Sequence, residues 1–292
     1  MTAVLAGQTV GFIGLGLMGR GMACNLLRAG ARLFVNDLDS AAVAGIAAEG
    51  AIAKETPAAV AAESAMVIVM VTDTPAAESV LLGAGGVLEG LEPGVLVIDM
   101  GTTAATATRH FAERIRAAGG EYVDAPVSGG MIGARDGTLS IMAGGTEAAV
   151  ERARPVLDVL GSRLTHVGPV GAGQVAKAAN QIIVGLTIGA VAEGLALARR
   201  AGVDPARVRE ALMGGFADSR ILEVHGKRMI ENDFEPGAHC TVQQKDLSQA
   251  LRLARELDQE LPATRLCLEL YDKLIAEGHG KLDHAALIKV LE

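Results

Sequence analysis

The sequence predicts an α/β domain, doubly wound around a mainly parallel sheet, followed by a second, all-α domain. Two observations carry this prediction. Short apolar runs alternate with Ala-rich helical stretches up to about residue 168, and helical periodicity dominates from there to residue 292. Alternation of this kind is typical of a parallel sheet with crossover helices. We therefore expect one domain over residues 1–168 and another over residues 169–292.

Five apolar runs in the first half predict parallel strands, namely Val10–Ile13, Leu33–Val35, Met66–Val71, Val95–Asp99 and Tyr122–Asp124. The predicted helices between them include Met18–Ala29, Ala41–Ala48 and Ala105–Ala118. Each of these helices is followed by a glycine, which is a frequent helix C-terminal signal. A further strand over residues 138–145, a helix over about residues 146–160 and a run over residues 163–168 complete this half.

The second half begins with an unusually long, Ala-rich helix, predicted over roughly Gly173–Ala201. Capping signals recur after it, for example Asp204 followed by Pro205 at the first position of a helix. Few β-branched runs follow Ile188, which favours an all-helical domain. This first helix is long enough that it could pack against another subunit.

Composition narrows the class of protein. The chain has 292 residues, of which 50% are hydrophobic and 21% charged, which is typical of a globular protein with two cores. A formal net charge of -8 argues against nucleic acid as a partner, because phosphate binding needs a basic face. The three cysteines, Cys24, Cys240 and Cys267, are widely spaced and odd in number, which favours reduced thiols over a disulfide framework.

Neither a membrane span nor a metal site is predicted. The longest apolar run, Ile182–Ala192, is closed by Glu193 and is too short to cross a bilayer. The N-terminus lacks the basic start and apolar core of a signal peptide, so we expect a cytoplasmic protein. The six histidines are scattered without metal-ligand spacing.

The segment "GLGLMG" matches the pattern G-x-G-x-x-G, with Gly14, Gly16 and Gly19 at the glycine positions. The match alone is weak in a chain with 37 glycines, but a strand enters it and a helix leaves it. In this context Gly14 permits a tight turn, Gly16 lets the backbone approach a pyrophosphate, and Gly19 lets helix and strand pack closely. The segment therefore predicts a Rossmann domain that binds a dinucleotide.

The second strand leads into Asp37, eighteen residues after Gly19, where this fingerprint expects an acid that binds the ribose hydroxyls. A 2′-phosphate would be repelled by Asp37, and no Lys or Arg lies between Asn36 and Glu49 to neutralise it. The cofactor predicted by this charge argument is NAD, with NADP less favoured.

Three further stretches are candidates for substrate chemistry. In "DAPVSGG" the Ser128 hydroxyl and the N–H groups of Gly129 and Gly130 could bind a carboxylate at a strand end, although a plain glycine turn explains the segment equally well. In "QQKDL", Lys245 and Asp246 open a helix, and the helix dipole alone is a sufficient reason for the acid.

The third stretch, "GAGQVAKAANQ", places Lys177 early in the long helix, with Asn180 and Gln181 three and four residues further on the same face. A lysine on an Ala-rich face beside a glycine turn would be partly desolvated, which favours its neutral form. A solvated surface lysine is the simpler interpretation of this segment taken alone.

Taken together, "GFIGLGLMG", "DAPVSGG", "GAGQVAKAANQ" and "KDL" resemble, in order and spacing, the β-hydroxyacid dehydrogenase family, which includes 3-hydroxyisobutyrate dehydrogenases and tartronate semialdehyde reductases. The resemblance covers nearly the whole chain, and it implies a homodimer or homotetramer to which the long helix contributes. It implies that Lys177 is the general acid/base, that Ser128, Gly129 and Gly130 bind the substrate carboxylate, and that Asn180 orients the substrate. "KAANQ", with Gln181 after Asn180, resembles the tartronate semialdehyde reductase branch. Lys245 would lie where substrate and cofactor meet, supported by Asp246.

The same resemblance implies a set of cofactor contacts, which are Leu17, Met18, Asp37, Val71 and Thr102 together with the loop glycines. The expected activity is NAD-dependent interconversion of a small β-hydroxyacid and its semialdehyde. Two alternatives remain open from the sequence. One is a reductase of imines or other carbonyls on the same fold, and the other is a non-catalytic dinucleotide-binding scaffold.

Overall fold

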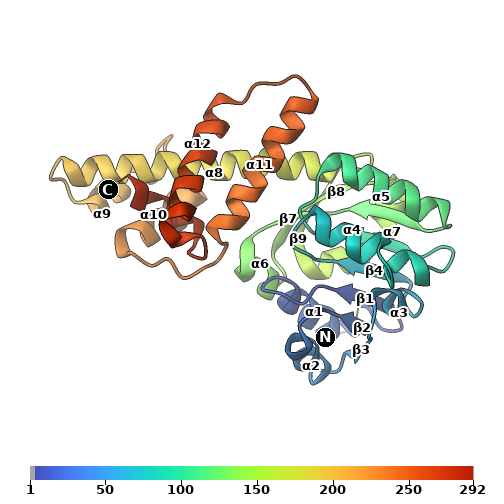
Figure 1. Ribbon diagram of the computed structural model, residues 1–292. Helices are drawn as coiled ribbons and strands as arrows, with labels where there is room; N and C mark the ends of the chain where they lie inside the picture. The colour runs from blue at the N-terminus through green and yellow to red at the C-terminus, as the bar shows by residue number, and fades with distance from the viewer. Residues whose placement is uncertain (1–3, 292) are drawn as a thin grey trace. The chain divides into compact units, whose positions relative to one another are not determined.

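The computed structural model describes residues 4–291 (Figure 1). The chain folds into two compact units, Met1–Lys177 and Ala178–Glu292. The strands of the first unit are β1 (Thr9–Ile13), β2 (Arg32–Asn36), β3 (Ile52–Ala53), β4 (Met66–Val69), β5 (Leu96–Asp99), β6 (Glu121–Asp124), β7 (Val127–Ser128), β8 (Leu139–Gly144) and β9 (Gly161–Gly168). Its helices are α1 (Gly19–Arg28), α2 (Ser40–Ala47), α3 (Pro57–Ala61), α4 (Thr74–Leu82), η1 (Val87–Gly90), α5 (Ala105–Ala117), α6 (Gly130–Asp136) and α7 (Glu147–Leu160).

The described strands form one sheet with the order β3-β2-β1-β4-β5-β6-β8-β7, and β9 pairs with β8. The six strands from β3 to β6 are parallel to their neighbours, whereas β8 runs antiparallel to β6 and β7. The order reverses direction between β1 and β4, which is the switch point of a doubly wound sheet. The predicted α/β Rossmann class with a mainly parallel sheet is confirmed.

Both faces of the sheet are covered, which explains why its central strands are continuously apolar. In β1 the side chain of Phe12 belongs to one buried cluster and that of Ile13 to the other. The cluster around Phe12 includes residues of α1 and α7, such as Met22 and Val156. The cluster around Ile13 includes residues of the opposite layer, such as Phe111 of α5. Alternation along each strand therefore anchors helices on both faces.

The second unit is helical within the described residues. Its elements are most of α8 (Ala172–Arg200), then α9 (Pro205–Leu212), α10 (Arg220–Glu231), α11 (Cys240–Glu256), α12 (Pro262–Leu274), a π-helical turn η2 (Ile275–His279) and a 3₁₀ segment η3 (His284–Val290). Its core gathers α8, α11, α12 and the C-terminal segment around buried side chains such as Ile188, Leu247, Tyr271 and Leu287. The predicted all-α character of this half is confirmed.

Within residues 4–291, one helix, α8, is by length and composition apolar enough to cross a membrane. The predicted apolar run, Ile182–Ala192, is the middle of this helix. Buried positions such as Ile188, Ala192 and Leu195 give α8 a core face in the second unit. A core helix of a water-exposed domain passes the same test of length and composition.

Candidate active site

The carboxyl ends of four parallel strands supply most of the candidate residues. Gly14 follows β1, Val71 follows β4, Thr102 follows β5, and the "DAPVSGG" segment begins at the last residue of β6. These ends lie at one edge of the sheet because the strands are parallel and adjacent. In open α/β sheets this edge, at the switch point, is where ligands bind. The first unit therefore collects its candidates on a single edge.

The three loop glycines differ in what surrounds them. Gly14 has a φ of +99°, and a Cβ there would collide with the backbone carbonyl of Met70. A Cβ at Gly19 would collide with the carbonyl of Gly14, so α1 can only start this close to β1 without a side chain. A Cβ at Gly16 would meet nothing within 4 Å. The open space at Gly16, three residues before α1, suits a close approach by a phosphate group.

Leu17 and Met18 complete the loop. Leu17 is 58% exposed, which is unusual for a leucine beside a packed sheet. Met18 is half-buried and packs against the core that lies under α1. Together with Val71 and Thr102, both half-buried, these side chains leave partly accessible surface at the carboxyl edge of the sheet.

The carboxylate of Asp37 holds the glycine loop as well as the turn in which it lies. One oxygen accepts a hydrogen bond from the backbone N–H of Leu15 at 2.5 Å, and the other accepts from the N–H of Asp39 at 2.7 Å. The end of β2 is thereby tied to the loop that follows β1. Each carboxylate oxygen has a second lone pair, so Asp37 can still accept hydrogen bonds from ribose hydroxyls.

Two buried carboxyls, Asp99 and Asp124, end β5 and β6 and lie opposite each other in the strand register. Burial raises the pKa of Asp99 to about 7, against hydrogen bonds from Tyr122, Gly101 and Thr103, and the charge of Asp124 raises it further. Burial likewise raises the pKa of Asp124 to about 6, although backbone N–H groups at the start of α8 lower it in part. Sequence reasoning did not select either residue.

Asp124 fixes the first turn of α8. Its Oδ1 accepts from the N–H of Gly171 at 2.7 Å, and its Oδ2 accepts from the N–H of Gln174 at 2.9 Å. These N–H groups have no partner within the helix, so the carboxylate caps it. A Cβ at Gly173 would lie 2.8 Å from Asp124 Oδ2, which explains the glycine-rich start of this helix.

Lys177 lies one turn further along α8 and is buried, with a relative exposure of 8%. Its Nζ donates a hydrogen bond to the backbone carbonyl of Val127 at 2.8 Å. The simpler interpretation of Lys177 as a solvated surface lysine is therefore wrong. A buried amino group held at a strand end is suited to exchanging a proton with a ligand at the sheet edge.

The "DAPVSGG" segment is more than a glycine turn. Val127 and Ser128 form β7, which pairs with β8, and α6 begins at Gly130. Gly129 and Gly130 have φ values of +135° and +61°, which favour glycine at both positions. Gly129 is exposed, and Ser128 and Gly130 are half-buried. The N-terminus of α6 thus presents N–H groups that lack a helical partner beside the Ser128 hydroxyl, an arrangement able to bind an anion.

In the second unit the four candidates form one hydrogen-bonded chain. Asn180 donates to Gln181 Oε1 at 2.8 Å, and Gln181 donates to Asp246 Oδ2 at 2.6 Å. Lys245 pairs with Asp246 Oδ1 at 2.8 Å. Gln181 and Asp246 are buried, and Gln243 adds a hydrogen bond to the Gln181 carbonyl at 3.0 Å. The structure thus brings together residues that are about 65 positions apart in the sequence.

The structure also brings together His225, Asp283 and His284, whose ligand atoms lie within 4.8 Å of one another. The two imidazole Nε2 atoms are 3.3 Å apart, and His225 Nδ1 lies 3.4 Å from Asp283 Oδ1. Asp283 is fully buried and pairs with Arg228 at 3.0 Å while also accepting backbone N–H groups. Because its oxygens are already occupied, we interpret this cluster as an anchor for the C-terminal segment rather than a metal centre.

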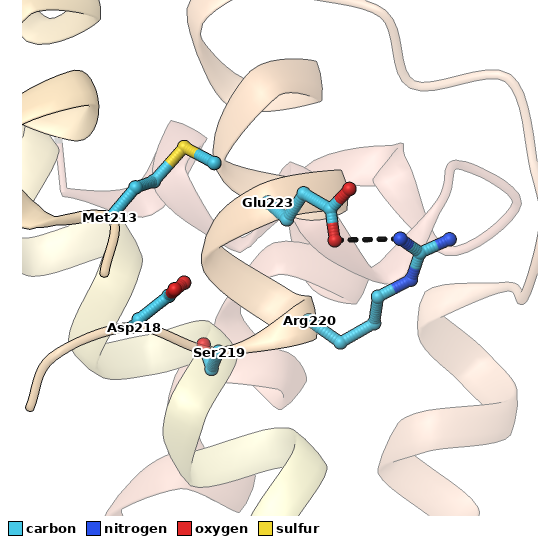
Figure 2. A pocket seen from close by; sticks show the side chains of 5 residues that line it. All are labelled: Met213, Asp218, Ser219, Arg220 and Glu223. Atoms are coloured by element: carbon cyan, nitrogen blue, oxygen red, sulfur yellow. Dashed lines mark hydrogen bonds and ion pairs between the residues drawn. The ribbon is translucent and has the colours of Figure 1, made fainter. Parts of the chain in front are cut away.

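The second unit also has a hollow at the start of α10 (Figure 2). It is lined by Met213, Asp218, Ser219, Arg220 and Glu223. Arg220 and Glu223 form an exposed ion pair at 2.6 Å, which Figure 2 marks by a dashed line. None of the predicted site residues lines this hollow, and it offers no buried polar group for catalysis.

A doubly wound sheet with a glycine loop, an acid after the second strand and a buried lysine at the ligand edge defines a dinucleotide-binding oxidoreductase. Two profiles of known protein families match the chain and support this class. Residues 9–168 match the profile described as the NAD binding domain of 6-phosphogluconate dehydrogenase. Residues 171–291 match a second profile, described as NAD-binding of NADP-dependent 3-hydroxyisobutyrate dehydrogenase.

The chain is 50% identical over 283 residues to 2-hydroxy-3-oxopropionate reductase of Escherichia coli (strain K12), and the match covers 97% of each chain. It resembles the crystal structure of 3-hydroxyisobutyrate dehydrogenase from Salmonella typhimurium, with 32% identity, a TM-score of 0.88, and coverage of 97% and 99% of the two chains. The Mycobacterium tuberculosis 3-hydroxyisobutyrate dehydrogenase with L-serine has 30% identity, a TM-score of 0.90, and coverage of 98% and 99%.

The chain therefore belongs to the β-hydroxyacid dehydrogenase family, and the predicted membership is confirmed. It is an oxidoreductase that uses a nicotinamide dinucleotide and interconverts a β-hydroxyacid and its semialdehyde. The two alternatives left open by the sequence, an imine-type reductase and a non-catalytic scaffold, are not favoured by these relatives.

Proposed function

We propose that the protein is a tartronate semialdehyde (2-hydroxy-3-oxopropionate) reductase that uses NADH, with Lys177 as its general acid/base. The observation that carries this proposal is the buried Lys177, whose Nζ is held 2.8 Å from the Val127 carbonyl at the ligand edge of the sheet. The relative that shares half of its residues bears the name of this activity. Asn180 followed by Gln181 favours the same branch of the family.

The nicotinamide cofactor supplies the hydride that reduces the aldehyde carbon. The loop around Gly14, Gly16 and Gly19 would hold its pyrophosphate, since the backbone at Gly16 is open where a Cβ would stand. We assign further cofactor contacts to Leu17, Met18, Asp37, Val71, Thr102 and Lys245.

Lys177 donates a proton to the carbonyl oxygen during reduction and accepts it from the hydroxyl in the reverse direction. Ser128 and the N–H groups of Gly129 and Gly130 bind the substrate carboxylate, since α6 begins there with donors that no helical carbonyl occupies. Asn180, Gln181, Lys245 and Asp246 complete the set of substrate residues. Two lysines supply positive charge for an anionic substrate, although the chain as a whole is acidic.

We further propose that NAD is preferred to NADP. The carboxylate of Asp37 is fixed by the N–H groups of Leu15 and Asp39 at the end of β2. A 2′-phosphate would meet this fixed negative charge, and no basic residue lies between Asn36 and Glu49. The ribose hydroxyls of NAD, in contrast, are donors that suit the carboxylate.

The assembly and the location are also proposals. Ile183, Ala190 and Leu197 are exposed apolar residues at helical spacing on α8, which supports burial of this face in a homodimer or homotetramer. We assign dinucleotide binding to residues 1–168 and substrate binding and oligomerisation to residues 169–292. Three free cysteines, two of them buried, support a reducing compartment such as the cytoplasm.

The test is NADH oxidation by the purified protein with tartronate semialdehyde, methylmalonate semialdehyde and an aldehyde without a carboxylate, each repeated with NADPH. We expect the highest kcat/KM with tartronate semialdehyde and NADH, and little turnover of the uncarboxylated aldehyde. Rapid turnover of methylmalonate semialdehyde instead would move the protein to the other branch of the family. Absence of turnover with both acids, while NADH still binds, would contradict the proposed function.

A further inference from the structure

One side chain at the start of α8 contacts the turn that follows β5. Gln174 is buried, with a relative exposure of 3%, and its amide faces the segment Gly101–Thr103. Its Nε2 donates to the carbonyl of Gly101 at 3.0 Å, and its Oε1 accepts from the N–H of Thr103 at 3.1 Å. The amide thus binds both peptide groups that flank Thr102, 71 to 73 positions away in the sequence.

The backbone of the same residue is fixed from the other side. Its N–H donates to Asp124 Oδ2 at 2.9 Å, at the end of β6. The turn after β5 is in turn held to its own strand, because Asp99 accepts from the N–H of Gly101 at 3.0 Å and from Thr103 Oγ1 at 3.1 Å. Gln174 therefore adds a link between the ends of β5 and β6, each of which carries a buried carboxyl.

Lys177 lies three residues beyond Gln174 on the same helix, a rise of about 4.5 Å. Any shift or rotation of the first turn of α8 moves Lys177 Nζ relative to Val127, to which it donates. Gln174 sets the position of this turn against the loop that carries Thr102. Loss of a contact that fixes both the first turn of α8 and the Thr102 loop is expected to lower the reaction rate. A misplacement of about 1 Å can cost about 100-fold in rate.

We propose that Gln174 is a positioning residue. It holds the turn that carries Thr102 and the turn of α8 that carries Lys177 at a fixed position relative to each other. The inference rests on the proposed function, which gives Thr102 a cofactor contact and Lys177 the proton transfer. An amide is required because its NH2 group donates to a C=O group while its oxygen accepts from an N–H group. Neither a carboxylate nor an apolar side chain of similar length provides both.

Two substitutions of nearly equal size test this. Gln174→Met removes both hydrogen bonds at every pH. Gln174→Glu retains the pattern only when protonated, since a carboxylic acid has an O–H donor and a C=O acceptor whereas the carboxylate has acceptors alone. In ionised Gln174→Glu, a carboxylate oxygen would replace the amide N–H that donates to the Gly101 carbonyl, so two acceptors would face each other. The readouts are kcat, KM for NADH, the NADH dissociation constant from fluorescence titration, and thermal unfolding, measured from pH 6 to pH 8.5.

We expect Gln174→Met to raise KM and the dissociation constant for NADH and to lower kcat, by about 10- to 100-fold in kcat/KM, at a constant ratio to wild type across this range. For Gln174→Glu we expect a similar loss at pH 8.5 and recovery toward wild type at pH 6. Ser64→Ala is the control, because it removes a buried hydrogen bond to the Val60 carbonyl and should lower only the thermal stability.

Wild-type kinetics in folded Gln174→Met would overturn the inference. Asp99 and Asp124 titrate in the same pH range, so each variant is compared with wild type at the same pH. After this comparison, a loss in Gln174→Glu equal to that in Gln174→Met at every pH would also overturn the inference, because the protonated acid would then fail to replace the amide. The proposed function is tested separately with Lys177→Ala. Turnover retained in that variant refutes the role of Lys177, while the NADH affinity of the Gln174 variants still reports on the Thr102 turn.

Discussion

The amino group of Lys177 donates a hydrogen bond to the carbonyl of Val127, with 2.8 Å between Nζ and the oxygen. Val127 lies in β7, within the segment that also holds Ser128, whereas Lys177 lies on α8, 50 residues later. The contact keeps a buried lysine beside the predicted carboxylate-binding loop. Because a lysine has up to three donors, Nζ can bind a substrate oxygen and keep its hydrogen bond to this carbonyl.

Replacement of Lys177 by alanine should abolish most turnover without loss of cofactor binding. Removal of a general acid/base typically costs about 10²- to 10⁴-fold in kcat. The measurement is steady-state NADH oxidation combined with fluorescence titration of NADH. Lys227→Ala is the matched control, since that lysine is exposed and pairs with Glu231 at 3.8 Å. A Lys177→Ala variant with more than about a tenth of wild-type kcat would refute the assignment.

Alanine at Gly16 should weaken NADH binding, whereas alanine at Gly19 should lower the stability of the fold. At Gly16 the added methyl group meets open space, so we expect an unfolding free energy within about 0.5 kcal/mol of wild type but at least about tenfold weaker NADH binding. At Gly19 the methyl group collides with the Gly14 carbonyl, so we expect destabilisation by about 1–3 kcal/mol. Chemical denaturation and NADH titration of both variants provide the check. Equal loss of stability in the two would contradict this distinction.

Asparagine at position 37 should reduce the preference for NADH over NADPH. It keeps one side-chain oxygen for the Leu15 or Asp39 N–H but removes the charge that would repel a 2′-phosphate. A contact of this kind is worth about 1–3 kcal/mol, so the ratio of kcat/KM for the two cofactors should shift by about 10- to 100-fold. Asp39→Asn serves as the control, because Asp39 caps α2 through the Ala41 N–H. An unchanged ratio in Asp37→Asn would leave the preference unexplained by Asp37.

The strands and helices of both units were largely predictable where their periodicity is strong. The long helix, predicted over Gly173–Ala201, is observed as Ala172–Arg200. The predicted strand over Met66–Val71 ends at Val69, because the chain leaves the sheet there and Val71 lies in the loop. The helix Gly130–Asp136 was not anticipated, since its opening glycines resemble a turn in sequence and act as a helix start only through their positive φ values.

The candidate site was predictable only in part. Lys177 and the glycine loop lie in segments whose residue spacing matches recognisable sequence motifs, so both could be selected from the sequence. Asp99, Asp124 and Gln174 could not. The contacts of Asp124 and Gln174 join segments at least 47 positions apart, and Asp99 accepts from Tyr122 of the neighbouring strand, 23 positions away. A buried acid at a strand end is a recognisable feature, but what it binds is decided by the tertiary fold. The same holds for His225 and His284, which are 59 positions apart and adjacent in space.

Asparagine at position 283 should destabilise the second unit. Asp283 pairs with Arg228 at 3.0 Å and accepts backbone N–H groups from Gly237 and Ala285. Burial raises the pKa of Asp283, but hydrogen bonding to His225, the charge of His284 and these N–H groups lower it more, so the net pKa is well below its usual range. Loss of one partner in a buried ion pair costs about 3–5 kcal/mol.

A depressed folded-state pKa makes this contribution pH-dependent. The stabilisation by Asp283 is fully present above about pH 4, the unfolded-state value, and is lost as the pH falls toward the folded-state value. The difference in unfolding free energy between wild type and Asp283→Asn should therefore be largest near neutral pH and shrink below pH 4. Denaturant titrations at several pH values measure it. Glu231→Gln, at an exposed ion pair, should cost less than about 1 kcal/mol at every pH.

Asp99 should have the opposite dependence on pH, since burial raises its pKa to about 7. Between about pH 4 and pH 7 the folded state holds a proton that the unfolded state has released, so the unfolding free energy falls as the pH rises through this window. Asp99→Asn cannot ionise and lacks this dependence, while Asp124 titrates in both proteins. The unfolding free energy of wild type minus that of Asp99→Asn should therefore fall from pH 4.5 to pH 8, by on the order of a few kcal/mol. Denaturant titrations across this range provide the measurement. A difference that stays constant would show that Asp99 is ionised throughout, and that its hydrogen bonds from Tyr122 and Thr103 outweigh its burial.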